Sequence, residues 1–484
     1  MRTILRQSIT LICCLLLLGC SQKSVKQEAA ELEHQGKFRE SEALLRNALG
    51  RSSGSSQDTL LFEIDRLRRI RLDFTLTEEK LLPQLQRALK DVTPEEFDRW
   101  VSEGKFDSRI IDDTLRFMNS STANLFKRNP EFNGRRVHPV DASAYHRGLW
   151  ETAQEILRAR EKSGSPYVLP KRFAVRMTVE ADSGAVPAGE TIRAWIPIPR
   201  DYPYQKDFVL RSSTVPPVSL SPPESPIRSA YFEQAAAPAG PTKFTVNYEF
   251  TRYAVSFALN PDSVKPYRPD DPIVAEYTRE APHVAFSDTI RALARKIIGD
   301  EKNPLKRAKR IFDWISVNQK YSYAIEYSTI RNISDYCLTR GYGDCGQHAL
   351  LFITLCRVAG VPARWQSGLY LFPDEEDIHD WTEIYVLPYG WIPADPDFGV
   401  DAMFYFTSLT EEQRRSLRDF YFGGMDQYRM AANSDHAQTL TPAKRSMRSD
   451  NVDFQRGEME YVTTNVYFDQ RSYHFYWTEQ RAVR

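Results

Sequence analysis

The chain has no excess of charge of either sign. Its 484 residues include 64 lysines and arginines and 64 aspartates and glutamates, which gives a formal net charge of zero at pH 7. A balanced chain has no strong overall field that would draw it towards a polyanion. We therefore do not expect nucleic acid to be a partner of this protein.

Long apolar runs are missing after the start of the chain, so no later segment is predicted to span a membrane. The early run from Leu11 to Leu18 is shorter than a membrane span and follows two arginines, which is typical of a secretory signal peptide. The run ends in Leu17-Leu18-Gly19-Cys20, which resembles a bacterial lipobox. This resemblance implies a signal peptide over residues 1–19, a lipid on Cys20, and a membrane-anchored lipoprotein on the periplasmic or surface face of a bacterial cell envelope. A plain secretory signal is the alternative.

Cysteine is scarce, with six residues in the chain. Two lie in the predicted signal peptide and Cys20 is the predicted lipid attachment site, which leaves Cys337, Cys345 and Cys356. An odd number of cysteines is a poor disulfide framework, so we expect at least one free thiol. Their spacings of eight and eleven residues contain no C-x-x-C pair of the kind that marks zinc sites. We therefore expect neither a metal nor another cofactor.

The length and the changes in hydrophobic periodicity predict a multidomain α+β protein. Residues 20–165 have helical periodicity and are predicted to form an α-helical domain that serves as a spacer or as a surface for a protein partner. Alternating apolar residues over 166–275 predict a β-sandwich followed by a linker. Helices followed by strands over 276–440 predict an α+β domain, and residues 441–484 predict strands that pack on that domain.

The stretch from Gly341 to Gly368 contains the thiol with the clearest functional surroundings. Cys345 follows a glycine-rich turn and precedes an apolar run, which predicts that it lies at the N-terminus of a buried helix. The helix dipole and the unpaired N–H groups at that end favour thiolate over thiol. A structural cysteine is the alternative, and it is the interpretation we prefer for Cys356, which lies deep in the apolar run.

Two residues further along the chain could activate such a thiol. His379 begins the alternating stretch HDWTEIYV, where a histidine at the edge of a cleft suits a general base, although a lone strand histidine is usually structural. Asp395 follows a Pro-Tyr-Gly turn, and folding this hairpin brings it near His379. A carboxylate there would fix the imidazole tautomer and stabilise the imidazolium. Asp380 is a rival that should point away from the His379 face, and Asp397 is a weaker rival.

The motifs Gly343-Asp344-Cys345, His379-x-Trp381-x-Glu383 and Gly390-Trp391-x-Pro393-x-Asp395 together resemble the transglutaminase-like superfamily. The resemblance covers about residues 288 to 397 and implies a papain-like core. It also implies that Cys345 is the nucleophile, His379 the base and Asp395 the residue that orients the base. Cys345 lies between Asp344 and Gly346 rather than between Gln and Trp, which argues against the cross-linking activity and calcium activation of the animal enzymes.

Together these features predict an exported cysteine acyl-transfer enzyme that acts on peptide or protein amides, with hydrolysis as the preferred outcome. The Cys345 thiolate would attack the carbonyl, His379 would protonate the departing amine, and water would resolve the thioester. The backbone N–H of Cys345 is expected to donate to the oxyanion, and the sequence does not identify a second donor. Transfer to an amine, as in protein cross-linking, is the enzymatic alternative, and a non-catalytic surface lipoprotein that binds a partner is the alternative from another class.

Overall fold

The computed structural model describes residues 23–448 and 450–480. The predicted signal peptide and Cys20 lie outside the described residues. The described chain forms two compact units, one made of the residues up to Leu67 together with Ile110–Thr114, and the other made of Arg68–Arg109 together with the chain from Leu115 onwards. Within the described ranges, none of the helices is both long enough and apolar enough to pass through a membrane.

The smaller unit contains a helical hairpin. It is formed by α1 (Val25–His34) and α2 (Phe38–Leu49), and α3 (Ser55–Asp73) begins in the same unit. The Ser24 hydroxyl accepts a hydrogen bond from the Gln27 N–H at 3.2 Å, and the Gln27 side chain accepts one from the Ser24 N–H at 2.9 Å. This reciprocal pair is a capping box, which fixes where α1 starts. Gly36 has a φ of +79°, which allows the tight turn between α1 and α2.

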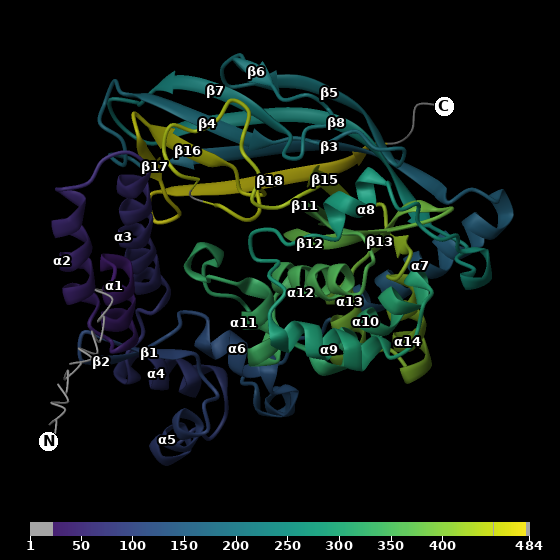
Figure 1. The fold of residues 1–484 in the computed structure, drawn as a ribbon, viewed down its shortest axis with the longest axis horizontal. Coiled ribbons are helices and arrows are strands. Elements are labelled where there is room, and N and C mark those ends of the chain that lie inside the picture. The colour runs from purple at the N-terminus through teal and green to yellow at the C-terminus, as the bar shows by residue number, and fades with distance from the viewer. Residues whose placement is uncertain (1–22, 449, 481–484) are drawn as a thin grey trace, which may run out of the picture. The chain divides into compact units, whose positions relative to one another are not determined.

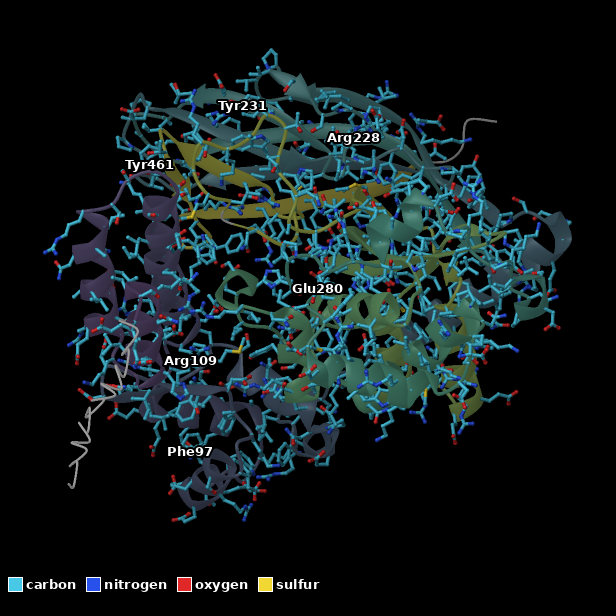
Figure 2. All side chains as sticks on the ribbon, viewed as in Figure 1. Phe97, Arg109, Arg228, Tyr231, Glu280 and Tyr461 are labelled. Carbon is cyan, nitrogen blue, oxygen red and sulfur yellow. The ribbon has the colours of Figure 1, made fainter. Side chains whose placement is uncertain are left out.

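The larger unit begins with a helical region that has its own buried cluster. Its helices are α4 (Glu78–Ala88), α5 (Pro94–Ser102), α6 (Ser121–Arg128), η1 (Pro130–Arg135) and α7 (Ser143–Ser163). Phe97 of α5, labelled in Figure 2, packs in this cluster with Leu85 and Leu125. The apolar faces of α4 to α6 therefore pack against one another, and Phe117 belongs to the same cluster.

Two short strands interrupt the segment in which the sequence predicts helices throughout. They are β1 (Ser108–Ile111) and β2 (Thr114–Phe117). The connecting residues Asp112 and Asp113 have φ angles of 47° and 65°. A two-residue hairpin turn requires this left-handed conformation, and aspartate tolerates it. The all-helical prediction missed this turn because it is carried by two aspartates and not by an Asn-Gly or Asp-Gly pair.

Two five-stranded sheets form a β-sandwich, drawn at the top of Figure 1. One sheet has the order β14-β8-β3-β18, with β5 also paired to β8, and the other has the order β17-β16-β4-β7-β6. The strands are β3 (Tyr167–Ala181), β4 (Thr191–Pro197), β5 (Gln205–Ser213), β6 (Ser219–Leu220), β7 (Ser229–Ala235), β8 (Thr242–Ser256), β14 (Gly424–Met425), β16 (Glu458–Tyr461), β17 (Thr464–Val466) and β18 (Arg471–Gln480). Alternate residues of both sheets, such as Phe173, Ile192 and Phe250, are buried between them. Tyr231 of β7, labelled in Figure 2, accepts a hydrogen bond from Arg193 Nε of β4 at 2.7 Å.

The C-terminal strands pair within this sandwich. We expected residues 441–484 to pack on the α+β domain, whereas β16 pairs with β4, where Met459 lies opposite Ala194, and β18 pairs with β3. The alternating pattern of a strand shows that it has one buried face, but it does not show which open edge it will join.

The remaining part of the larger unit is the predicted α+β domain. Its four-stranded sheet has the order β13-β12-β11-β15, made of β11 (Ala363–Phe372), β12 (Glu375–Val386), β13 (Gly390–Ala394) and β15 (Arg429–Asn433). The helices and short segments around it are η2 (Pro261–Ser263), α8 (Pro272–Tyr277), α9 (Asp288–Ile298), α10 (Pro304–Asn318), β9 (Lys320–Tyr321), η3 (Tyr327–Thr329), α11 (Ile333–Arg340), β10 (Tyr342–Gly343), α12 (Cys345–Val358), α13 (Pro396–Phe404) and α14 (Glu411–Phe420). Helix α12 is almost fully buried and packs on β11 and β12 (Figure 1). The α+β fold class is therefore confirmed.

The sheet of this domain shares its apolar core with the sandwich. Leu369 and Leu371 of β11 and Met430 of β15 belong to the same buried cluster as the sandwich residues. Strand β11 thus packs against α12 and also against the core of the sandwich.

Candidate active site

Cys345 is the first residue of α12. Asp344 caps the helix, because its side chain accepts a hydrogen bond from the Gln347 N–H at 3.1 Å. Cys345 is partly buried and takes part in no disulfide. A Cβ at Gly346 would lie 2.8 Å from Asp380 Oδ2 and would overlap the Tyr327 hydroxyl. Glycine is therefore needed here so that these two side chains can approach the start of the helix.

His379 and Asp395 are in direct contact. His379 lies in β12, Asp395 caps α13, and the His379 Nε2 to Asp395 Oδ2 distance is 2.7 Å. Arg429 Nη1 donates to the same carboxylate oxygen at 2.5 Å. Burial alone would raise the pKa of Asp395, but the charges of His379 and Arg429 lower it to about 2. Asp395 is therefore ionised at neutral pH and can hold the imidazole in one tautomer.

The thiol lies close to this pair. The sulfur of Cys345, a ring nitrogen of His379 and a carboxylate oxygen of Asp397 all lie within 4.8 Å of one another. Since Nε2 of His379 is bonded to Asp395, Nδ1 is the nitrogen available to exchange a proton with the thiol. The structure thus brings Cys345, His379 and Asp395 together.

Asp397 lies in a different environment from Asp395. Its side chain is buried and its Oδ1 is 2.7 Å from Nδ1 of His348, a residue of α12. Burial raises the pKa of Asp397 to about 8, and burial lowers the pKa of His348 to about 4. Asp397 is therefore neutral at pH 7 and cannot stabilise an imidazolium as Asp395 can.

Cys345, His379 and Asp397 also make a group that could hold a metal ion, which the sequence did not indicate. Thiolate, imidazole and carboxylate are the donors that zinc prefers, so the donor set fits. Binding would require Asp397 and the thiol to lose their protons and would occupy the nucleophile. The chemistry described below is carried by the side chains alone.

The thiol is less acidic than its place at a helix N-terminus suggests. Burial and then the carboxylates of Asp380, Asp344 and Asp397 raise the pKa of Cys345 well above its usual value. Asp380 Oδ2 lies 3.4 Å from the sulfur, which donates to it. The expectation of a thiolate considered the helix dipole alone, whereas burial and these carboxylates outweigh it. Because the thiol is protonated at neutral pH, its proton must leave as the sulfur attacks the substrate.

Two residues that the sequence analysis did not single out support the pair His379 and Asp395. Arg429 of β15 bridges Asp395 and Asp426, with its Nε 3.1 Å from Asp426 Oδ2. Gln455 donates from Nε2 to the His379 carbonyl at 2.7 Å and to Asp380 Oδ1 at 2.8 Å. Both come from parts of the chain after the motif region, where no local pattern marks them.

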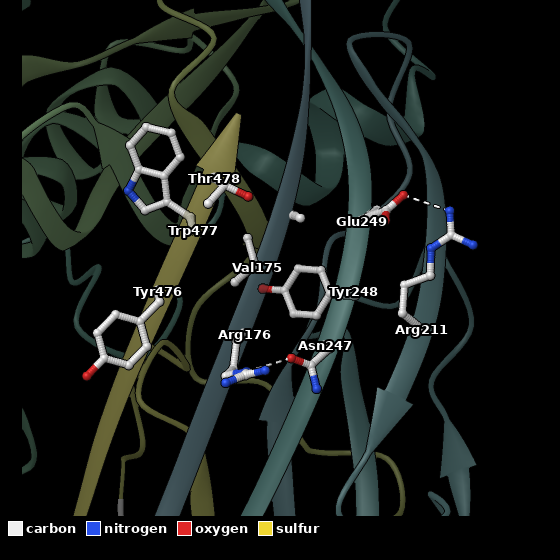
Figure 3. Close-up of a pocket in the computed structure, with 10 residues that line it drawn as sticks. Val175, Arg176, Arg211, Asn247, Tyr248, Glu249, Tyr476, Trp477 and Thr478 are labelled. Atoms are coloured by element: carbon white, nitrogen blue, oxygen red, sulfur yellow. Dashed lines mark hydrogen bonds and ion pairs between the residues drawn. The ribbon is translucent and has the colours of Figure 1, made fainter. Parts of the chain in front are cut away.

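A separate pocket lies on the sandwich and has a different character. Figure 3 shows its lining, which includes Tyr248, Tyr476 and Trp477, with Arg176 bonded to Asn247 at 2.8 Å. Its lining contains none of the residues that surround Cys345. We therefore place the chemistry at α12.

The fold and these contacts define an α+β protein with a papain-like arrangement of cysteine, histidine and aspartate. Residues 291–396 match the family model of the transglutaminase-like superfamily, so this segment is a transglutaminase-like domain. The match ends one residue after Asp395 and includes Cys345 and His379. The matched segment therefore contains all three residues that the geometry brings together.

The chain is also similar to two curated bacterial proteins. It is 25% identical over 178 residues to an uncharacterized protein of Haemophilus influenzae, which is 32% of this chain and 48% of that protein. It is 28% identical over 156 residues to the uncharacterized protein YebA of Bacillus subtilis, which is 28% of this chain and 21% of that protein. The chain thus spans about half of the first relative and about a fifth of the second.

Two solved structures align with parts of this chain. A candidate cysteine protease from Cytophaga hutchinsonii aligns with 66% of this chain and 93% of its own, at 16% identity and a TM-score of 0.43. The periplasmic domain of TgpA from Pseudomonas aeruginosa aligns with 56% of this chain and 95% of its own, at 14% identity and a TM-score of 0.25.

Proposed function

We propose that the protein is a cysteine acyl-transfer enzyme that hydrolyses amide bonds of peptides or proteins. The observation that carries the proposal is the contact between His379 and an ionised Asp395 at 2.7 Å, with the sulfur of Cys345 within 4.8 Å of the histidine and Asp397. This arrangement supplies a nucleophile, a base and a carboxylate that orients the base.

In the first half of the reaction the amide is cleaved. The Cys345 sulfur attacks the carbonyl carbon while its proton passes to Nδ1 of His379, and Asp395 stabilises the resulting imidazolium. The backbone N–H of Cys345, in the first turn of α12, has no partner within its own helix and can donate to the oxyanion. His379 then gives the proton to the departing amine, the C–N bond breaks, and a thioester remains on the sulfur.

In the second half the thioester is resolved. His379 takes a proton from water as the water oxygen attacks the thioester carbonyl, and the carboxylic acid leaves as the proton returns to sulfur. If an amine attacks in place of water, the product is a new amide, which is the cross-linking alternative.

Incubation with a glutamine-containing peptide and a labelled amine tests the proposal. We expect cleavage or ammonia release with no label in the peptide, and a Cys345→Ala variant with no activity. Incorporation of label into the peptide would show that the enzyme transfers the acyl group to an amine rather than to water. Unchanged biological function of the folded Cys345→Ala protein would favour a non-catalytic binding protein, with the N-terminal helices as a candidate partner surface.

We further propose that the protein is held at a bacterial cell envelope by a lipid on Cys20. The support is the sequence Leu-Leu-Gly-Cys after a short apolar run. Metabolic labelling with a radioactive fatty acid should mark the protein, and Cys20→Ser should abolish both the label and recovery in the membrane fraction. Label that persists in Cys20→Ser would overturn this proposal.

A further inference from the structure

A small acidic cavity lies beside the nucleophile. Its volume is about 240 Å³, and five carboxylates contribute to its lining: Asp73, Glu326, Asp344, Asp450 and Asp453. Two of its lining residues lie at the start of α12: Asp344 directly precedes Cys345 and caps the helix, and Tyr327 donates a hydrogen bond to Asp344. The side chains that line this cavity can therefore contact a substrate that reaches the start of α12.

One oxygen of Asp453 is available to accept a hydrogen bond from a ligand in the acidic cavity. This side chain is 3% exposed, and its Oδ1 has no hydrogen-bond partner among the described residues. Burial and Asp450 raise the pKa of Asp453 well above its usual value, and a buried carboxyl oxygen without a donor is unfavourable. A ligand that donates hydrogen bonds within the cavity would remove that cost.

The lining is rich in carboxyl groups, and burial also raises the pKa of Asp344 and that of Asp453. Among the described lining residues, Arg456 is the single cation facing the five carboxylates. Arg69 acts on Glu326 and Arg109 acts on Asp73 from nearby positions, yet burial still raises the pKa of Asp73 to about 7 and raises that of Glu326. A bound cation would favour the charged forms of these carboxyls.

The spacing of the carboxylates favours an ammonium group over a metal ion. A calcium ion needs six to eight oxygens at about 2.3–2.6 Å, so its ligand atoms must converge closely. Among residues 23–448 and 450–480, the group of this kind consists of Cys345, His379 and Asp397, and none of them lines the acidic cavity. An ammonium group instead has three donors that can reach separate carboxylates. The volume of about 240 Å³ is several times the ~30 Å³ of one water, which leaves room for part of an alkyl chain.

We propose that the acidic cavity binds a primary ammonium group of the substrate, next to the amide that Cys345 attacks. The inference rests on the proposed function and adds the substrate class, which is peptides with a free amino group near the scissile amide. Asp380, whose Oδ2 lies 3.4 Å from the sulfur, continues the row of carboxyl groups from the cavity to the nucleophile, and burial raises its pKa well above the usual value.

A competition experiment tests the preference. A casein peptide mixture with free amino groups and the same mixture with acetylated amino groups compete for the wild-type enzyme, and mass spectrometry gives the ratio of their kcat/KM values. We expect the ratio to favour the free amines by about tenfold or more, as is typical of a charge-assisted hydrogen bond. Asp453→Asn and Glu326→Gln should each bring the ratio towards one.

Glu412→Gln is the matched control, because it removes an exposed carboxylate of α14. It should leave the ratio unchanged. A ratio near one in the wild type, or a ratio that survives both cavity substitutions in folded protein, would overturn the proposal.

Binding to the Cys345→Ala protein separates this inference from the proposed function. Calorimetry with the amide of Gly-Lys-Gly should show binding, and the fully acetylated tripeptide should bind more weakly. Selective binding without turnover by the wild type would keep the ammonium site and overturn the hydrolase, whereas turnover without amine preference would do the opposite. Binding of neither tripeptide, or stabilisation by calcium chloride with no effect of the amine, would overturn the ammonium site.

Discussion

Asp395 and Asp397 are two positions apart, yet their surroundings hold them in opposite states. His379 and Arg429 hold the pKa of Asp395 at about 2 in spite of its burial, whereas burial raises the pKa of Asp397 to about 8. At pH 7 the first carboxyl is charged and the second is neutral. The proposed role of orienting His379 therefore belongs to Asp395.

The same substitution at the two positions should have different effects. We expect Asp395→Asn to lower kcat for peptide-amide hydrolysis by about 10³- to 10⁴-fold with little change in KM, because the imidazolium loses its counter-charge. Asp397→Asn replaces a group that is already neutral and should cost less than about tenfold. Equal losses in the two variants would contradict the assignment.

The Cys345 thiol should titrate at unusually high pH. Because burial and then three nearby carboxylates raise its pKa, the rate of alkylation by iodoacetamide should keep rising with pH beyond about 8.5, the midpoint of a free thiol. Asp380→Asn removes the ionisable carboxyl 3.4 Å from the sulfur, one of the groups that raise the pKa of the thiol, and should move the midpoint to lower pH. Glu412→Gln should leave it in place, and a midpoint below that of a free thiol in the wild type would contradict this account.

At the level of single residues, sequence motifs indicate the ones that carry a local pattern. Cys345 at a helix start and Asp395 after a hairpin turn belong to such patterns, and the structure brings both to His379. Arg429 and Gln455 have no local pattern, because they reach the site from distant strands and loops. The raised pKa of the thiol was not predictable for the same reason, since it depends on burial in the folded protein.

At the level of elements, the start of α12 is defined by how closely its neighbours approach it. Tyr327 donates to Asp344 Oδ1 at 2.5 Å, and Asp380 lies beside the same turn. Both contacts require a glycine at 346. The helix start is therefore positioned by packing as well as by its cap.

Gly346→Ala should destabilise the protein although alanine is the better helix former. The added Cβ would lie 2.8 Å from Asp380 Oδ2, and we expect a loss of about 1–3 kcal/mol, a lower Tm and a lower kcat. Gly148→Ala in α7 is the control, because its Cβ would meet the Phe372 ring at an ordinary 3.5 Å. That variant should gain up to about 1 kcal/mol and raise Tm. A gain of stability in both variants would contradict the packing argument.

At the level of the whole larger unit, the transglutaminase-like domain is inserted into the chain of the sandwich. The chain leaves the sandwich after β8 and forms this domain, touches the sandwich again with the short strand β14, which pairs with β8, and returns with β16, β17 and β18 after β15. The order of helical, sandwich and α+β segments was predictable, because each has its own hydrophobic period. The partners of the returning strands were not, because pairing over such sequence separations is decided by the assembled core.

Removal of β18 should therefore destabilise the sandwich and the domain that shares its core. Deletion of residues 471–480 takes away the partner of β3 and the contact of Trp477 with Phe173, whose ring centroids are 5.6 Å apart. We expect aggregation and loss of activity, measured by size-exclusion chromatography and peptide hydrolysis. Tyr476→Ala, a change at a side chain that is 62% exposed, should leave both unchanged. A soluble and active deletion variant would contradict the shared core.

The insertion also sets an order of events during synthesis. A ribosome releases β3 and β4 well before β16 and β18, so an edge of each sandwich sheet stays unpaired until the inserted domain has been made. Arg429 of β15 and Gln455, which lies just before β16, are made after Cys345, His379 and Asp395. A nascent chain that ends just before residue 455 therefore carries the thiol, its base and Asp395 without the Gln455 side chain that bonds to the His379 carbonyl.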